Sequence, residues 1–320
     1  MPSNRVRDSW RNVLRITSVR IIVQTVMFGL FLAFVLLTTF ANLDRLPGLR
    51  FWLGKFLEVD PLIALASALT THTVYKDLLW SLVILVPTLF LGRFFCGWIC
   101  PYGSLHHFVG WLFPAVGWAS PTTPPASRAD GGQCPPYITT APADGGQCPP
   151  YVANRYRPSQ RIKYYILLAL LVPAVFGMLQ IGLFDPLCLL YRSLSTAVLP
   201  AAQMPAPALF GPPRMHQGSW LIGFLLFGLV AANLAYPRFF CRVLCPLGAL
   251  LGVISRFAWW RIERDPDRCQ GCDRCRLHCE GACDPHAQLR KAECFVCFNC
   301  IEECPENALQ FVFFPPRQHE

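Results

Sequence analysis

Long apolar runs alternate with shorter polar stretches along this 320-residue sequence. A helix that crosses the hydrocarbon core of a bilayer needs about 20 apolar residues, and four runs have that length or nearly so. The second run is the weakest, because Arg93 limits it and Pro87, which can kink a helix, lies inside it. The pattern predicts four transmembrane helices, at Ile21–Phe40, Leu78–Phe95, Tyr164–Phe184 and Trp220–Tyr236.

Basic residues gather at the ends of these runs. About 20 apolar residues without a small-residue cleavage motif favour a retained first helix over a signal peptide. Lys and Arg mark cytoplasmic segments, so we expect a multi-pass protein of a bacterial inner membrane with both termini in the cytoplasm. The arginines before the first run are Arg5, Arg7, Arg11, Arg15 and Arg20.

The composition supports a membrane protein. Hydrophobic residues make up 53% of the chain and charged residues 15%, and the mean hydropathy is +0.37. Soluble domains carry about 25% charged residues, so a soluble enzyme is excluded and membrane lipid is an expected partner. The formal net charge of +9 does not indicate nucleic acid, because the basic residues lie at the ends of apolar runs.

One pattern occurs twice. Arg-Phe-Phe-Cys-x3-Cys-Pro-x-Gly at residues 93–103 recurs at residues 238–248, and Asp-Pro-Leu at 60–62 recurs at 185–187. Each copy predicts a membrane hairpin with an outer Asp-Pro-Leu turn and an inner cysteine motif. Because both copies start on the inner side, we expect a pseudo-twofold axis along the membrane normal.

The repeat divides the chain into four parts. Near-perfect duplication around Cys134 and Cys148 in the linker favours a recent insertion over metal ligation by these cysteines. The predicted parts are a first membrane hairpin (1–113), a proline-rich cytoplasmic linker (114–160), a second membrane hairpin (161–262) and a ferredoxin-like domain (263–320).

The most specific signal is a pair of four-cysteine runs near the C-terminus. Both have the spacing Cys-x2-Cys-x2-Cys-x3-Cys, and the second ends in Cys-Pro. Zinc also binds Cys-x2-Cys pairs, but this doubled spacing is that of bacterial two-cluster ferredoxins, in which one cysteine crosses to the other cluster. We predict two [4Fe-4S] clusters, one on Cys269, Cys272, Cys275 and Cys304, the other on Cys294, Cys297, Cys300 and a fourth cysteine.

That fourth ligand has two candidates. Cys279 has the expected spacing but no following proline, whereas Cys283 lies four residues later and begins a Cys-Asp-Pro sequence. We favour Cys279 and keep Cys283 as the alternative. Two neighbouring clusters would make this segment an electron-transfer path rather than a catalyst.

The Cys-x3-Cys-Pro motifs are further candidates. Cys96 and Cys100, like Cys241 and Cys245, lie four residues apart and share a face on a continuous helix. Pairing of the hairpins would bring all four sulfurs to one site that binds a metal or cycles between dithiol and disulfide. The alternative is that these cysteines only pack between helices.

Other polar residues give weaker signals. His106 and His107 follow the first motif, and we favour solvated or hydrogen-bonded histidines over metal or quinone ligands. Asp60 and Asp185 suit a proton exit and a helix cap equally well.

Together these features resemble the NapH/NosR-type membrane polyferredoxins, and the short NapH-like form most closely. The resemblance covers nearly the whole chain except the linker. It implies that electrons pass between membrane quinol and a partner redox protein. CcoG-like proteins share a Cys-x3-Cys-Pro element and ferredoxin cysteines, and that resemblance implies copper reduction during oxidase assembly.

We therefore expect an all-α membrane protein of four transmembrane helices in two repeated hairpins, with a small C-terminal α+β two-cluster ferredoxin-like domain. Its expected function is electron transfer between the quinone pool and a partner redox protein. Copper reduction and membrane redox regulation are the alternatives. The expected cofactors are two [4Fe-4S] clusters, and a quinone and a metal at the Cys-x3-Cys-Pro motifs stay open. No nucleic-acid partner and no catalytic residue are expected.

Overall fold

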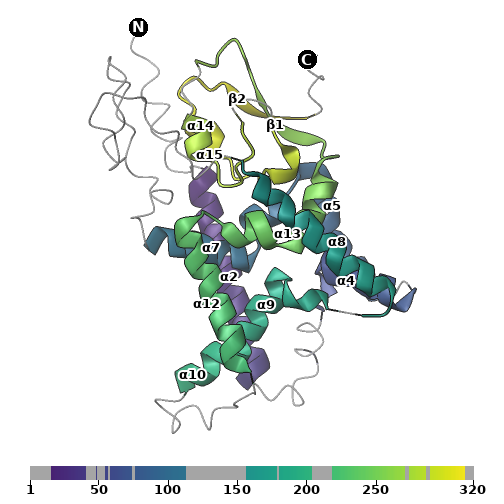
Figure 1. Ribbon diagram of the computed structural model, residues 1–320. Helices are drawn as coiled ribbons and strands as arrows, with labels where there is room; N and C mark the ends of the chain where they lie inside the picture. Colours follow the sequence, from purple (N-terminus) through teal and green to yellow (C-terminus); the bar gives the residue numbers. More distant parts are fainter. Residues whose placement is uncertain are drawn as a thin grey trace.

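The computed structural model describes residues 16–40, 48, 55–56, 58–73, 76–112, 156–178, 180–203, 218–270, 274–285 and 289–313. Most of these residues are helical (Figure 1). The α-helices are α2 (Ile16–Phe40), α4 (Pro61–Thr71), α5 (Leu82–Leu91), α6 (Phe94–Trp98), α7 (Pro101–Leu112), α8 (Ile162–Val175), α9 (Pro186–Ser193), α10 (Leu199–Gln203), α12 (Ser219–Ala235), α13 (Pro246–Ser255), α14 (Arg274–Leu277) and α15 (Asn299–Glu302). Shorter 3-10 turns are η2 (Lys76–Ser81), η5 (Pro158–Arg161), η6 (Ile181–Leu183) and η9 (Lys291–Glu293), the π turns are η7 (Leu194–Val198) and η8 (Phe240–Leu244), and the strands are β1 (Trp260–Arg264) and β2 (Leu309–Phe313).

The helices form one part of the molecule, and the cysteine-rich tail from β1 to β2 covers one end of it (Figure 1). α2 packs against α6 and α7, and α8 packs against α4 and α13. The tail lies beside the N-terminal end of α2, where the Thr17 N–H donates a 2.9 Å hydrogen bond to Glu302. One buried core joins apolar residues of both repeats, including Leu62 and Leu187, to Phe295 of the tail.

The prediction of four transmembrane helices was wrong. Among the described residues, only Ile16–Thr39 in α2 is long and apolar enough to cross a membrane. The other apolar helices fall short of the roughly 20 residues that a span needs, since α5 has 10 residues, α8 has 14 and α12 has 17. The described part is therefore mostly helical, with one candidate span and one small sheet.

Hydropathy overestimates the lengths of these helices because an apolar run can continue past the residue at which a helix ends. α5 ends at Leu91, and Gly92 turns the chain with a φ of 85°. α8 ends two residues after Pro173, and Gly177 follows with a φ of 86°. Glycine adopts such a left-handed backbone at little cost, whereas other residues do not. Two of the predicted runs are therefore divided by turns.

The repeated Asp-Pro-Leu sequence begins a short helix in each copy. The Asp60 carboxylate accepts a 2.8 Å hydrogen bond from the Leu62 N–H at the start of α4. Asp185 accepts bonds of 2.9 and 2.8 Å from the N–H groups of Leu187 and Cys188 at the start of α9. Aspartate caps and a proline at the first helical position both favour helix initiation. The capping interpretation of these aspartates is confirmed.

Large apolar side chains cover the exterior of the helical part. Ile22 on α2 is 61% exposed, Leu168 on α8 is 60% exposed and Phe227 on α12 is 71% exposed. Soluble proteins rarely expose extended apolar surface. This exterior therefore suits contact with lipid, although α5, α8 and α12 are too short to span a bilayer.

The tail is closed by a two-stranded sheet. β1 and β2 pair antiparallel, with Ile262 opposite Phe311. The buried side of the sheet, with Ile262 and Leu309, packs on cysteines from both runs. The sheet thus brings together the two ends of the segment that carries all the predicted cluster ligands.

The second cysteine run packs directly on α6. Gly97 approaches this run so closely that a Cβ atom added there would lie 2.2 Å from the Phe295 carbonyl oxygen. The Trp98 indole N–H donates a 2.9 Å hydrogen bond to the Val296 carbonyl. On the other side of α6, Gln24 of α2 donates a 2.7 Å hydrogen bond to the Gly97 carbonyl. α6 is therefore clamped between α2 and the tail.

Substitution of Gly97 by alanine tests this contact. The added Cβ would meet the Phe295 carbonyl at 2.2 Å, and overpacking of this kind costs about 1–3 kcal/mol. We expect a lower unfolding temperature and faster hydrogen exchange in the tail. Gly29→Ala in α2 is the matched control, because its Cβ would meet nothing within 4 Å and alanine favours a helix by about 0.5–1 kcal/mol. Equal effects of the two substitutions would contradict the contact.

Candidate metal centres

The predicted ligands of the second cluster lie together. Cys279, Cys294, Cys297 and Cys300 come from both cysteine runs, and all are buried. Burial raises the pKa of the Cys300 thiol well above its ordinary value, and the neighbouring Cys297, Cys279 and Cys294 raise it further. Such mutual influence requires proximity. The fold therefore gathers one candidate site from residues that are up to 21 positions apart in sequence.

Cys283 lies beside one of these ligands. The sulfurs of Cys279 and Cys283 are 3.3 Å apart, and the Cys283 N–H also donates to the Cys279 sulfur at 3.3 Å. Hydrogen bonds from Cys283 hold the pKa of Cys279 at about 7 despite its burial. In a [4Fe-4S] cluster each thiolate binds its own iron, so two sulfurs this close compete for one position. The preference for Cys279 over Cys283 therefore stays a prediction.

The first set of ligands lies nearer the surface. Cys269, Cys275 and Cys304 are only partly buried, whereas Cys272 falls outside the described residues. The Ala308 N–H donates a 3.3 Å hydrogen bond to the Cys304 sulfur, an interaction of the kind that tunes the potential of an iron-sulfur cluster. The tail thus has an outer and an inner group of cysteines.

The donor chemistry of these two groups fits iron-sulfur clusters. In the described part of the chain, no three metal-ligating side chains surround one point in the way that a single ion requires. A tetrahedral zinc site needs four ligands around one ion, whereas the thiolates of a cubane bind separate irons and stand farther apart. The doubled cysteine spacing, rather than this absence, favours clusters over the zinc alternative.

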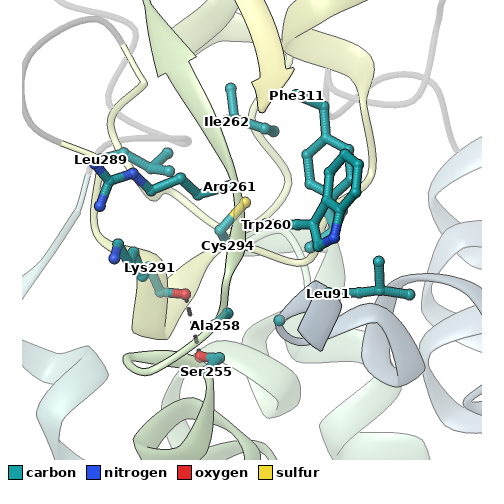
Figure 2. Close-up of a pocket in the computed structure, with 12 residues that line it drawn as sticks. Leu91, Ser255, Ala258, Trp260, Arg261, Ile262, Leu289, Lys291, Cys294 and Phe311 are labelled. Carbon is teal, nitrogen blue, oxygen red and sulfur yellow. Dashed lines mark hydrogen bonds between the residues drawn. The ribbon is translucent and has the colours of Figure 1, made fainter. Parts of the chain in front are cut away.

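A cavity beside the inner group is too small for an organic cofactor. Figure 2 shows Cys294 at this cavity, with Ile262 of β1 above it and Ser255 of α13 below it. The cavity measures about 20 Å³, whereas sites for drug-sized ligands measure about 300–1,000 Å³. The inner group is therefore closely enclosed by protein at this point.

The two Cys-x3-Cys-Pro motifs meet in the core. Cys96, Cys100, Cys241 and Cys245, which we call the cysteine quartet, are all buried in one cluster. Burial raises the pKa of the Cys245 thiol well above its ordinary value, and the nearby sulfurs of Cys241 and Cys96 raise it further. Since Cys96 belongs to the other repeat, the two motifs lie side by side.

Each motif ends on a wide turn rather than on a continuous α-helix. The Cys100 N–H donates to the Phe95 carbonyl at 2.9 Å, and the Cys245 N–H donates to the Phe240 carbonyl at 2.8 Å. Both bonds reach five residues back, whereas α-helical bonds reach four. Such π-type turns often occur at functional sites. The shared helix face expected from the spacing is thus replaced by a turn of the same form in both repeats.

Two buried arginines cross between the repeats. Arg93 and Arg238, which we call the arginine pair, open the two motifs. The Arg238 side chain donates a 3.4 Å hydrogen bond to the Cys96 carbonyl. Conversely, Nη2 of Arg93 would lie 2.7 Å from a Cβ atom at Gly248. The glycine of the second Cys-Pro-x-Gly sequence therefore leaves room for the arginine of the first repeat.

Two buried glutamates of the tail bind the arginine pair. Glu280 lies 2.7 Å from Arg20 and 2.6 Å from Arg238. Glu293 forms ion pairs with Lys163 and with the other arginine of the pair, the latter at 3.5 Å. Arg20 in α2 and Lys163 in α8 lie near the starts of the first helices of the two repeats. The ion pairs therefore follow the same twofold relation as the motifs.

The positive charges of this network keep the Glu280 carboxyl group ionised. Burial alone would raise the pKa of Glu280, but the guanidinium groups of Arg20 and Arg238 outweigh it and lower the pKa below its usual range. The sequence indicated no role for the two glutamates, used Arg20 only to orient the first helix, and used Arg93 to bound a helix and to open the repeated motif. The one signal for this network was the arginine that recurs at the head of each motif.

His106 is part of the same core. It is fully buried, and its ring lies 4.9 Å from the ring of Tyr102. Burial and then the charge of Arg238 lower the pKa of His106 to about 3. The histidine is therefore neutral at physiological pH, and the expectation of a solvated side chain does not apply to it.

Substitution of Glu280 by glutamine tests the ion-pair network. Loss of one partner from a buried ion pair costs about 3–5 kcal/mol, so we expect a large fall in unfolding temperature, measured by circular dichroism in detergent. Glu58→Gln is the control, because Glu58 pairs with Lys55 at 2.6 Å but is 37% exposed, and exposed pairs contribute at most about 1 kcal/mol. A loss in Glu280→Gln no larger than in the control would contradict the network.

Comparisons with known proteins match these segments. A family described as a 4Fe-4S binding domain matches residues 78–116 and 217–263, the segments that contain the cysteine quartet. The putative electron transport protein YccM of Escherichia coli is 25% identical over 277 residues, which are 84% of this chain and 64% of YccM. The ferredoxin-type protein NapH of Escherichia coli is 25% identical over 264 residues, which are 78% of this chain and 72% of NapH.

A further relative extends well beyond this chain. The regulatory protein NosR of Pseudomonas aeruginosa is 26% identical over 256 residues, which are 74% of this chain and 29% of NosR. The chain spans less than two thirds of YccM as well. No solved structure matches the chain. The matched segments and relatives confirm the resemblance that the repeated motifs indicate: the chain is similar to ferredoxin-type proteins of the NapH/NosR type.

Proposed function

We propose that this protein transfers electrons through two [4Fe-4S] clusters in its tail, between the quinone pool of a bacterial inner membrane and a partner redox protein. The observation that carries the proposal is the difference in burial between the two cysteine groups, one partly exposed and one enclosed against α6. An exposed centre exchanges electrons with a partner, whereas an enclosed centre exchanges them with its neighbours. The two groups therefore suit successive stations of one path.

The proposed clusters supply one-electron transfer when they are bound. The chain supplies thiolates, hydrogen bonds to sulfur and positive charge near the inner group. The positive charge is that of the Arg20 guanidinium, which lies close enough to the Cys297 sulfur to interact with it electrostatically. Positive charge and N–H donors favour the reduced state of such a centre. The proposed ligands are Cys269, Cys272, Cys275 and Cys304 for the outer cluster, and Cys279, Cys294, Cys297 and Cys300 for the inner cluster.

The proposed division of the chain keeps its sequence boundaries. The two repeats, residues 1–113 and 161–262, would present the cysteine quartet, and the tail, residues 263–320, would carry the clusters. Support comes from the matching turns at Cys100 and Cys245. β1 (Trp260–Arg264) contains the proposed boundary of the tail at residue 263.

The proposed location rests on α2 and on the apolar exterior. α2 includes the one candidate span among the described residues, and its N-terminal end lies beside the tail (Figure 1). Arginines precede α2 in the sequence, and such residues stay on the cytoplasmic side. The tail would therefore lie in the cytoplasm, where thiols and iron-sulfur clusters remain reduced.

Low-temperature EPR spectroscopy tests the link to quinone. Protein purified anaerobically in detergent is treated with a reduced menaquinol analogue or with dithionite, and the reduced-cluster signals are compared. We expect the quinol to produce signals of the same form as dithionite, because a quinol-linked path requires cluster potentials within reach of the pool. Signals with dithionite alone would contradict the quinol link and favour a cytoplasmic electron donor.

A further inference from the structure

A second cavity lies where the tail meets the start of α8. It measures about 640 Å³, and sites for small molecules measure about 300–1,000 Å³. Its walls come from the segment before α8, from the first turn of α8, from the end of α13 and from the turn η9 of the tail. Unlike the cavity beside Cys294, this one is large enough for a ligand.

Basic side chains line this cavity. Glu293 is the acidic residue among its described lining residues, and it is already paired with the buried Lys163 and Arg93. The cavity therefore keeps a positive charge, and a hollow lined by one sign of charge concentrates ligands of the opposite sign. The basic lining residues are Arg161, Arg256, Arg290 and Lys291.

Tyrosine rings orient two of these arginines. The guanidinium group of Arg290 lies 4.0 Å from the centre of the Tyr156 ring, and that of Arg256 lies 6.0 Å from the centre of the Tyr164 ring. The Tyr164 hydroxyl donates a 3.1 Å hydrogen bond to Glu293, which fixes that ring. A guanidinium group held in this way forms paired hydrogen bonds with phosphate oxygens. The lining therefore suits a phosphate group.

An apolar stripe leads from the cavity along the exterior of α8. Tyr165 lines the cavity and is 68% exposed, Leu168 is 60% exposed, and Phe176, directly after the helix, is 80% exposed. With Val172 between them, these residues are three or four positions apart and so share one face. From residue 165 to residue 176 the stripe extends for about 16 Å. One leaflet of the hydrocarbon core is about 15 Å thick, so the stripe has the length of an acyl-chain layer.

We propose that the cavity binds the phosphate of an anionic phospholipid from the cytoplasmic leaflet, with the acyl chains along the stripe on α8. The lipid is favoured over a free phosphate because Tyr165 belongs to both the cavity and the stripe. Basic pockets on the cytoplasmic side of membrane proteins bind such head groups, and tyrosines gather at that interface. The site goes beyond the proposed function and rests only on the proposed location of the tail.

The bound lipid would fasten the tail to the helical part. The Ser255 hydroxyl of α13 donates a 3.3 Å hydrogen bond to the Lys291 carbonyl, and Arg93 donates one of 2.9 Å to the Ala292 carbonyl. A phosphate between Arg161 at the start of α8 and Arg290 of the tail would add a third link to this turn. The lipid would thus stabilise the segment that directly precedes Cys294.

Lipid titration of the full chain in detergent, followed by native mass spectrometry, tests the recognition of charge. We expect one tightly bound molecule of palmitoyl-oleoyl phosphatidylglycerol. Arg256→Gln and Arg290→Gln should each weaken its binding about fivefold, because a base near an anionic head group contributes about that factor. Arg192→Gln is the control, since Arg192 is also exposed but lies at the end of α9 and does not line the cavity.

Three results of this titration would overturn the proposal. Phosphatidylcholine has the same chains without a net charge, and equally tight binding of it would exclude recognition of an anion. Inorganic phosphate that binds as tightly as the lipid would assign the cavity to a free anion. Unchanged binding of phosphatidylglycerol in both arginine variants would exclude the cavity itself.

Leu168→Ser tests the stripe. Loss of apolar contact with the acyl chains should weaken the binding of phosphatidylglycerol severalfold at unchanged iron content. Leu221→Ser is the matched control, because Leu221 is 56% exposed but lies on α12. Equal effects of the two substitutions would overturn the place of the chains. Lipid binding does not involve electron transfer, so a protein that binds the lipid but is not reduced by quinol would contradict only the proposed function.

Discussion

Two buried glutamates hold the cysteine-rich tail on the helices. Glu280 and Glu293 are each enclosed with two bases, one from the start of the first helix of a repeat and one from the arginine pair. Since an unpaired charge in the interior costs several kcal/mol, none of these side chains can leave its partners without a large penalty. The network therefore fixes the tail, both repeats and the axis between them at the same time.

The remaining contacts at this interface follow from that constraint. With the tail held down, the backbone of Phe295 reaches α6 at a point where only glycine fits, and its ring lies between the arginines. This places the inner cysteine run against the core that buries the quartet. The two glutamates thus hold the cysteine-rich tail against the helices that carry the quartet.

Much of the chemistry could be predicted from the sequence because it is local. The cysteine spacings, the doubled Arg-Phe-Phe-Cys motif and the Asp-Pro helix starts are short patterns. The structure places the residues of the doubled motif in one core and caps two helices with the Asp-Pro aspartates. Helix lengths could not be predicted in this way. Apolar composition continues through Gly92 and Gly177, and the positive φ values that end the segments there depend on single glycines within apolar runs.

The ion-pair network could not be predicted from the sequence either. Arg20 and Glu280 are 260 residues apart, and Lys163 and Glu293 are 130 apart, so no local spacing relates them. A basic residue beside an apolar run fits a topology signal equally well. Only the packing of the tail on the helices shows that Arg20 and Arg93 bind carboxylates in the interior.

We propose that the inner cluster connects the quinone pool with the outer cluster of the tail. Rapid-mixing freeze-quench EPR after addition of a menaquinol analogue tests this connection most directly, with Cys300→Ser used to disable the inner cluster. We expect the signal of the outer cluster to appear much more slowly in Cys300→Ser than in the unmodified protein. Equal rates of reduction of the outer cluster in the two proteins would contradict the connection.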